Sequence, residues 1–209
     1  MAQAFFITLE GGEGVGKTTN LEFIQQYLAY HCVDVLRTRE PGGTPLGEQI
    51  RHLLLNSASM DSHAELLLVF SARAQHVNSL IKPALTAGRW VLCDRFTDAS
   101  YAYQGGGRQL DSKVIGFLEN WVQDDLQPDL TLLLDAPVEI GMARAKQRNQ
   151  SDRFELEVPA FFEQVRRAYL ERAAQYPERI KVIDAARPLN AVQADIARHL
   201  DGLLAANRT

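Results

Sequence analysis

The chain has 209 residues, of which 46% are hydrophobic and 23% are charged. These values are typical of a globular protein and exclude a mainly disordered chain, and the length suits one domain spanning 1–209. The formal net charge of -4 argues against nucleic acid as a partner bound through overall charge.

The sequence predicts a cytoplasmic protein with no membrane partner. No window approaches the ~20 consecutive apolar residues of a membrane span, and the first nine residues lack the basic start of a secretory signal. Cys32 and Cys93 form neither a disulfide framework nor a metal-binding spacing. We interpret both as reduced thiols in the core.

The first half of the chain alternates short apolar runs with helical patterns. We predict strands over 5–9, 33–38 and 90–93, and helices over 17–31, 46–55 and 61–86. Asp61 is placed to cap the last of these helices, with Glu65 in its first turn.

The second half continues the alternation. After a glycine-rich loop over 101–108, we predict strands over 130–134 and 180–183, and helices over 111–125, 137–148, 159–175 and from 188 onward. Strands that alternate with helices in this way predict an α/β fold, with a parallel sheet of five strands covered by helices on both faces. The polar segment 147–155 lies between two helices, where a mobile lid is expected.

The strongest motif runs from Gly11 to Thr18 and matches G-x-x-x-x-G-K-[ST] between a predicted strand and a predicted helix. Its glycines let consecutive backbone N–H groups surround an anion, and the helix that follows directs its positive end at the phosphates. Lys17 supplies a charge to the β- and γ-phosphates, and Thr18 a hydroxyl to Mg²⁺. We therefore predict a nucleoside triphosphate site.

Asp94 and Arg95 follow the third predicted strand. The carboxyl ends of parallel strands face the crevice in which α/β proteins bind ligands. Asp94 is a candidate ligand of Mg²⁺, directly or through water, and Arg95 a candidate bidentate partner of phosphate. The alternative is a surface ion pair at a helix start.

Other cations have both a functional and a structural interpretation. Arg39 is a candidate phosphate ligand that Glu40 would orient, and Arg51 follows at helical spacing, although both positions also suit an ordinary surface. A further basic cluster comprises Arg144, Lys146, Arg148 and Arg153. Such a cluster is usually a solvated helix face, but beside a phosphate loop, mobile arginines can neutralise the transferring group.

Phe70 and Arg73 lie one turn apart on a predicted helix. An aromatic face and a guanidinium group suit a flat base, whereas a phenylalanine in a leucine-rich helix is more often part of the core.

Taken together, the sequence resembles the bacterial thymidylate kinase family. The matching stretches are 10–19, 38–44, 70–73, 94–95, 102–108 and 128–135. The resemblance implies a P-loop kinase fold with a short lid, transfer of the γ-phosphoryl group of ATP to dTMP to give dTDP, ATP and Mg²⁺ as cofactors, and a homodimer. It implies ATP binding by Gly11, Gly12, Glu13, Gly14, Val15, Gly16, Lys17, Thr18, Thr19 and Arg144. The catalytic residues would be Lys17, Asp94, Arg95, Arg148 and Arg153, with Thr18 and Asp94 on the metal.

The resemblance also implies roles at the acceptor nucleotide. Phe70 would stack on thymine, and Arg73 would donate to a thymine carbonyl. Ser100 and Gln104 would contact the remaining polar edge of the base, and Tyr103 would pack against the deoxyribose.

The acceptor phosphate would lie among Arg39, Arg51 and Arg95, with Glu40 nearby and Glu13 close to the 3'-hydroxyl. Some members carry an arginine inside the phosphate loop, where this chain has Gly14. The missing charge would then come from the lid, through Arg144, Arg148 or Arg153.

Two alternatives remain. A deoxynucleoside kinase shares the phosphate loop and the Asp-Arg pair, but it would need a general base such as Glu40 or Asp94, and the several arginines argue against it. A nucleotide-dependent switch would usually carry an Asn-Lys-x-Asp motif for guanine, and no such tetrapeptide occurs.

Overall fold

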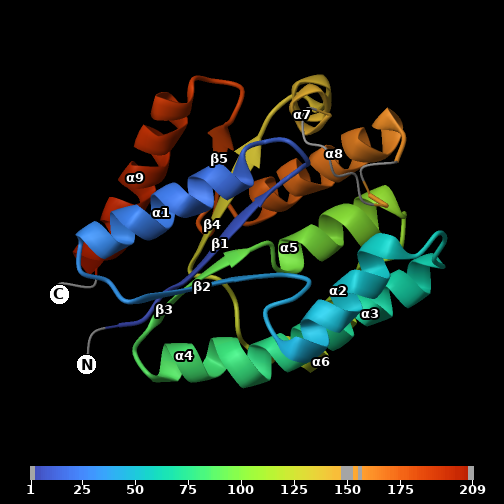
Figure 1. Ribbon diagram of the computed structural model, residues 1–209, viewed down its shortest axis with the longest axis horizontal. Helices are drawn as coiled ribbons and strands as arrows, with labels where there is room; N and C mark the ends of the chain where they lie inside the picture. Colours follow the sequence, from blue (N-terminus) through green and yellow to red (C-terminus); the bar gives the residue numbers. More distant parts are fainter. Residues whose placement is uncertain (1–2, 147–152, 155–156, 207–209) are drawn as a thin grey trace.

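The computed structural model describes residues 3–146, 153–154 and 157–206. At the centre of this described part lies a sheet of five parallel strands in the order β2-β3-β1-β4-β5 (Figure 1). The strands are β1 (Phe6–Gly11), β2 (Val35–Arg39), β3 (Trp90–Asp94), β4 (Leu130–Asp135) and β5 (Ile180–Asp184). The predicted α/β fold with a parallel sheet is therefore confirmed.

Helices connect the strands and cover both faces of the sheet. The α-helices are α1 (Lys17–Tyr30), α2 (Pro45–Asn56), α3 (Ser62–His76), α4 (Lys82–Thr86), α5 (Thr97–Ser100), α6 (Ser112–Gln123), α7 (Val138–Ala145), α8 (Pro159–Gln175) and α9 (Leu189–Ala206). Two π-helical segments, η1 (Val77–Ile81) and η2 (Tyr101–Gly107), continue α3 and α5. The predicted cap is present, since Asp61 accepts hydrogen bonds from the backbone N–H groups of His63 and Ala64.

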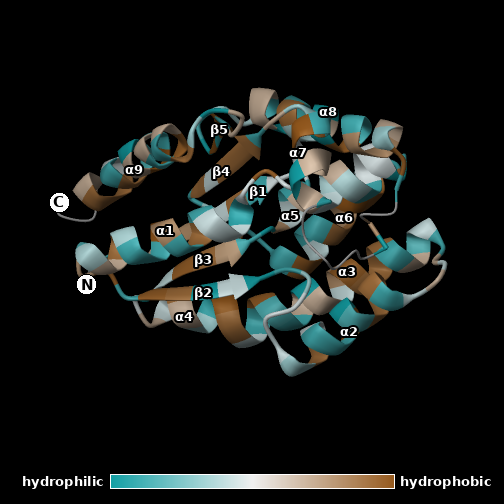
Figure 2. Cartoon of the chain, turned by 45° about the horizontal axis from the view of Figure 1, so that its top comes forward, coloured by the Kyte–Doolittle hydropathy of each residue, from teal (hydrophilic) through white to brown (hydrophobic). Residues whose placement is uncertain are grey.

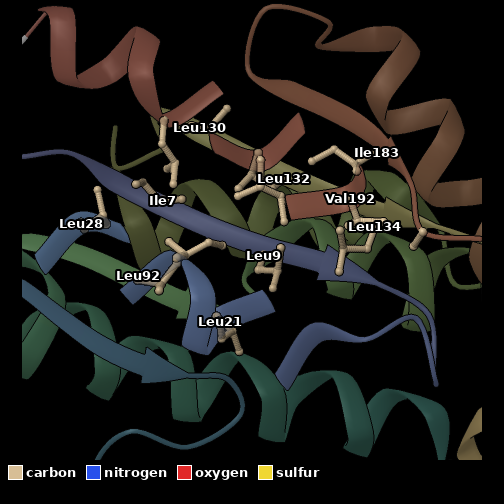
Figure 3. Close-up of a cluster of buried hydrophobic side chains, with 14 of the residues drawn as sticks. Ile7, Leu9, Leu21, Leu28, Leu92, Leu130, Leu132, Leu134, Ile183 and Val192 are labelled. Atoms are coloured by element: carbon tan, nitrogen blue, oxygen red, sulfur yellow. The ribbon is translucent and has the colours of Figure 1, made fainter. Parts of the chain in front are cut away.

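Successive residues of each strand point to opposite faces of the sheet, and both faces are buried along the central strands β1, β3 and β4. One face packs under α1 and α9, where Ile7, Leu9 and Leu132 meet Leu21 and Val192 (Figure 3). The other face packs under the α3–α4 run and under α8. Burial on both sides explains why β4 is an almost continuous apolar run, as parallel sheets require.

The hydropathy of the chain follows these layers. Figure 2 shows hydrophobic colour concentrated on the strands, with hydrophilic residues on much of the outer helix surface. Among the described residues, no helix combines the length and the apolar character needed to cross a membrane.

The prediction of a loop over 101–108 is wrong, because most of this stretch forms η2. Its glycines do serve close approach, as predicted, but against α8. A Cβ atom at Gly106 would lie 2.8 Å from the backbone oxygen of Gln164, and one at Gly107 would overlap the ring of Phe161. The glycines therefore let η2 pack directly on α8.

Two further predictions need correction. The helix predicted over 61–86 contains η1, so that its hydrogen-bond pattern changes between α3 and α4. Cys32 is exposed at the end of α1, with a φ of 59°, and only Cys93 is the predicted core thiol. The reason is local, since Cys32 lies in the turn that reverses the chain between α1 and β2.

Candidate active site

The phosphate loop connects β1 to α1 at the carboxyl edge of the sheet. The backbone at Gly14 and Gly16 has φ values of 69° and 90°, a left-handed conformation that favours glycine. No side chain caps α1, which leaves N–H groups of its first turn for an anion. Lys17 Nζ donates to the backbone oxygen of Gly12 at 2.7 Å, and burial, followed by the charge of Arg95, lowers the pKa of Lys17 to about 8. An anionic ligand would raise the pKa of Lys17 again, because it would favour the charged form.

Gly14 packs against α7. A Cβ atom at this position would overlap the backbone oxygen of Gly141, so that no larger side chain fits without moving the helix. This close approach gives a physical reason why the loop carries no arginine at Gly14.

Asp94 and Arg95 end β3 beside the phosphate loop. Arg95 has a φ of 66°, and its guanidinium donates to the oxygen of Gly11 at 2.8 Å and to Glu13 Oε1 at 2.6 Å. It also stacks on Tyr103, whose hydroxyl donates to the same carboxylate at 2.8 Å. Because these contacts hold Arg95 inside the molecule, the alternative of a surface ion pair is wrong.

The residues predicted to bind Mg²⁺ suit that ion. Asp94 Oδ1 is buried and has no hydrogen-bond partner among the described residues, and Thr18 lines the same cavity. No group of three or more His, Cys, Asp or Glu side chains in the described part of the chain is arranged to hold a metal. Mg²⁺ does not require one, since it usually binds through one or two carboxylates together with water and substrate phosphates.

A cavity of about 580 Å³ extends from the phosphate loop along the carboxyl ends of the strands. Its lining includes Glu13, Lys17, Thr18, Glu40, Arg51, Arg73, Asp94, Arg95, Ser100, Tyr103, Gln104, Arg144 and Phe154. One end is therefore rich in phosphate-binding groups. The other end has hydroxyl, amide and aromatic groups suited to a nucleoside.

Arg73 lies in the wall of this second end and is only 1% exposed. Its guanidinium donates to Glu40 Oε2 at 2.7 Å, to Ser100 Oγ at 3.0 Å and to the oxygen of Phe96 at 3.1 Å. Glu40 also forms a hydrogen bond with His76. Burial alone would raise the pKa of Glu40, but Arg73 and His76 hold it below its usual value.

Comparison with known proteins decides between the candidate families. The model of the thymidylate kinase family matches residues 9–196. The chain belongs to the thymidylate kinase family. The resemblance inferred from the sequence is thereby confirmed, and with it a nucleoside monophosphate kinase activity that uses ATP as the phosphate donor.

Individual thymidylate kinases agree over nearly the whole chain. The enzyme of Chromohalobacter salexigens is 59% identical over 209 residues, which covers 98% of this chain and 99% of the relative. The enzyme of Methylococcus capsulatus is 55% identical over 205 residues, which covers 98% of this chain and 99% of that relative. The crystal structure of thymidylate kinase from Ehrlichia chaffeensis superposes with a TM-score of 0.78 at 34% identity, covering 95% of this chain and 99% of that one.

Within this thymidylate kinase fold, the predicted pairing of Glu40 with Arg39 is wrong. Arg39 is paired with Glu48 at 2.8 Å, its side chain is 51% exposed, and it is not among the residues that line the cavity. Glu40 instead turns inward to Arg73, because the adjacent residues Arg39 and Glu40 point to opposite sides of the sheet where β2 ends. Arg51 does line the cavity, and it donates to the oxygen of Pro41.

Phe70, predicted to stack on thymine, is 2% exposed and packs with Leu66, Ile115 and Leu118. The guanidinium of Arg73 lies 4.7 Å from its ring centroid, and Phe70 is not part of the cavity lining. The structure therefore places Phe70 behind Arg73, in the core that the alternative interpretation described.

The predicted lid arginines occupy different places. Arg144 lines the cavity and donates to the oxygen of Ala185. Arg153 donates to Glu65 and to the oxygen of Leu54, away from the phosphate loop. Arg148, with most of the predicted lid, lies outside the described residues.

Sequence reasoning missed Glu10, a buried carboxylate directly behind the phosphate loop. Glu10 accepts hydrogen bonds from the backbone N–H of Phe96 and from the hydroxyl of Tyr169, each at 2.7 Å. The Tyr169 hydroxyl in turn accepts one from Arg95. A charged residue inside an otherwise apolar strand was the available signal. Burial, then the charge of Asp98, raises the pKa of Glu10 to about 7.

This raised pKa predicts a pH-dependent stability. In the unfolded chain the pKa of Glu10 is near 4.5. The contribution of Glu10 to folding stability is therefore fully present below pH 4.5 and is lost as the pH rises through about 7. We compare the unfolding free energy of Glu10→Gln with that of the wild type at pH 5 and at pH 8. Relative to the wild type, the variant is expected to be about 2–3 kcal/mol more stable at pH 8 than it is at pH 5. Urea unfolding at both pH values measures it. Glu22→Gln, on the exposed face of α1, is the control, and a pH-independent difference for Glu10→Gln would contradict the argument.

Proposed function

We propose that the cavity binds ATP and dTMP end to end and transfers the γ-phosphoryl group, giving ADP and dTDP. The observation that carries this proposal is one continuous cavity lined both by the phosphate loop and by the wall around Arg73. Kinases of this class depend mainly on positioning and on charge neutralisation. A shared cavity positions the two nucleotides, and the cations that line it neutralise their charge.

The acceptor needs no strong general base. A nucleoside monophosphate has a second pKa near ~6, so its attacking oxygen is already largely anionic at pH 7. That oxygen forms the new bond to the γ-phosphorus while the bond to the bridging β–γ oxygen breaks, and ADP leaves. Repulsion between the two anions is the obstacle, and Lys17, Arg51 and Arg95 line the cavity where it must be relieved.

Mg²⁺ belongs to the same proposal, with Thr18 and Asp94 as the residues that would hold it. When bound, the ion supplies positive charge to the β- and γ-phosphate oxygens. The buried, unpartnered Oδ1 atom of Asp94 supports the assignment.

The nucleoside end suits a pyrimidine deoxynucleotide. Arg73 presents guanidinium donors, while Ser100 and Gln104 add a hydroxyl and an amide. Tyr103 is fixed by Glu13 and Arg95, so that its ring forms a rigid wall beside the sugar. We assign the 3'-hydroxyl to Glu13 and the base to Arg73, Ser100 and Gln104.

The test is ADP release from ATP over a panel of acceptors, with and without Mg²⁺. The panel holds dTMP, dUMP, UMP, dCMP, AMP, GMP and thymidine. We expect strong preference for dTMP and no turnover after chelation of the metal. Turnover of thymidine but not dTMP would overturn the proposal in favour of a nucleoside kinase.

We also propose that the protein is a cytoplasmic homodimer. ATP and dTMP are cytoplasmic metabolites, and both cysteines are free. Val114, Phe117 and Trp121 recur at spacings of three and four on α6, and Trp121 is 74% exposed. Leu67 is exposed on the neighbouring α3. A second copy would cover this apolar face.

Trp121→Glu is expected to weaken that dimer, because it places a charge in a face that association would bury. Light scattering coupled to size exclusion should give twice the chain mass for the wild type, and a mass nearer that of one chain for the variant at micromolar concentration. Tyr30→Glu changes another exposed aromatic residue, at the end of α1, and serves as the control. A single-chain mass for the wild type would contradict the proposal.

A further inference from the structure

A buried carboxylate behind the cavity collects three hydrogen-bond donors. Glu65, in the first turn of α3, is 0% exposed. Its oxygens accept from Gln104 Nε2 at 2.8 Å, from Arg108 Nε at 3.2 Å and from Arg153 NH2 at 2.8 Å. Gln104 reaches Glu65 from η2, and Arg153 adjoins Phe154, which lines the cavity. Glu65 itself does not line the cavity and would act through Gln104.

The chemistry of Glu65 decides how the amide of Gln104 is oriented. A carboxylate flanked by two guanidinium groups accepts hydrogen bonds and donates none. Gln104 must therefore turn its NH2 group toward Glu65, which places its carbonyl oxygen at the other end of the amide. Among the described residues, that oxygen has no hydrogen-bond partner, and Gln104 is part of the cavity lining.

We propose that Glu65 is a positioning residue for base selection, because it holds Gln104 with its acceptor oxygen available to the bound base. Thymine and uracil carry an N–H donor at N3 between two carbonyl acceptors, whereas N3 of cytosine is an acceptor and its neighbouring amino group a donor. Arg73 supplies a donor for a carbonyl group, and Gln104 supplies the acceptor for N3–H. The arrangement therefore rejects cytosine, because the acceptor oxygen of Gln104 would face the acceptor N3 of that base. This inference rests on the dTMP site proposed above.

The test is Glu65→Gln, which preserves size but can donate as well as accept. The amide of Gln104 is then free to turn over. We expect the ratio of kcat/KM for dTMP to that for dCMP to fall at least about tenfold, in line with the cost of a mispaired polar group. The KM for ATP should stay unchanged. Glu119→Gln, a buried carboxylate that bonds Tyr101 and Gln127, is the matched control and should keep the ratio.

A double-mutant cycle separates positioning from simple stability. If Glu65 acts through Gln104, Glu65→Gln should not change the dTMP:dCMP ratio further in a Gln104→Ala background. A parallel fall of kcat/KM for both nucleotides, with the ratio preserved, would overturn the inference while leaving the kinase function intact. Failure of the wild type to phosphorylate dTMP would instead overturn the proposed function.

A measurement on the wild type keeps the inference testable if Glu65→Gln does not fold. In the dTMP complex, nuclear Overhauser contacts should join the side-chain NH2 protons of Gln104 to Glu65 and not to the thymine imide proton. The reverse pattern would overturn the inference.

Discussion

Replacement of Lys17 by alanine is expected to lower kcat by about 10²–10³-fold while the protein stays folded. Lys17 is placed to neutralise charge on the transferring phosphoryl group, and this interaction is strongest in the transition state. Among the described residues, the Nζ atom of Lys17 donates hydrogen bonds only to the backbone oxygens of Gly11 and Gly12. Within the described ranges, the substitution therefore takes an ion-pair partner from no carboxylate.

Steady-state kinetics with saturating ATP and dTMP measure the loss, and circular dichroism checks the fold. Lys181→Ala, at a partly exposed position of β5 outside the cavity, is the control and should keep wild-type kcat. A kcat near the wild-type value for Lys17→Ala would remove Lys17 from the reaction.

Replacement of Arg73 by alanine is expected to affect both stability and substrate binding. The guanidinium is the main charge partner of Glu40, and its loss leaves that buried carboxylate with His76 as its remaining ion-pair partner in the described part of the chain. Breaking a buried ion pair from one side typically costs about 3–5 kcal/mol. We expect a loss of unfolding free energy of about 3 kcal/mol, since His76 retains part of the pairing.

The binding effect of Arg73→Ala is separable from the loss of stability. Under conditions where the variant is still folded, KM for dTMP should rise at least about tenfold, because a donor to the base is lost, while KM for ATP stays near the wild-type value. Urea unfolding gives the stability, and Arg37→Ala, at a surface position of β2, is the control. Equal increases in KM for both nucleotides would assign Arg73 a purely structural role.

The fold was largely predictable because its signals are local. Alternation of apolar runs with helical patterns specifies parallel strands joined by helices, and the phosphate loop requires glycines at defined positions. The error over 101–108 arose where distant segments meet. Tyr101–Gly107 forms η2 because its glycines let it pack against Phe161 and Gln164 of α8, and nothing within the stretch itself indicates that partner.

The sequence predicted which residues form the candidate site better than it predicted which of them form hydrogen bonds with each other. The sequence pointed to Arg73, Ser100 and Gln104 as one group through the family resemblance, and the structure lines the cavity with all three. The sequence analysis paired Glu40 with the adjacent Arg39, whereas Glu40, which directly follows β2, accepts a hydrogen bond from Arg73 of α3. Sequence neighbours in a strand point to opposite faces, so adjacency misled the pairing.

By itself, the sequence determined the fold class, the nucleotide-binding loop and the family, because each depends on residue types at short, fixed spacings. Only the tertiary structure decided which buried charges share a hydrogen-bond network. It connected Glu10 to Tyr169 and Arg95, and Glu65 to Gln104. Those partners come from different elements brought together by burial of both faces of the sheet. A buried carboxylate must find its donors within hydrogen-bond reach, and three-dimensional packing alone determines which donors those are.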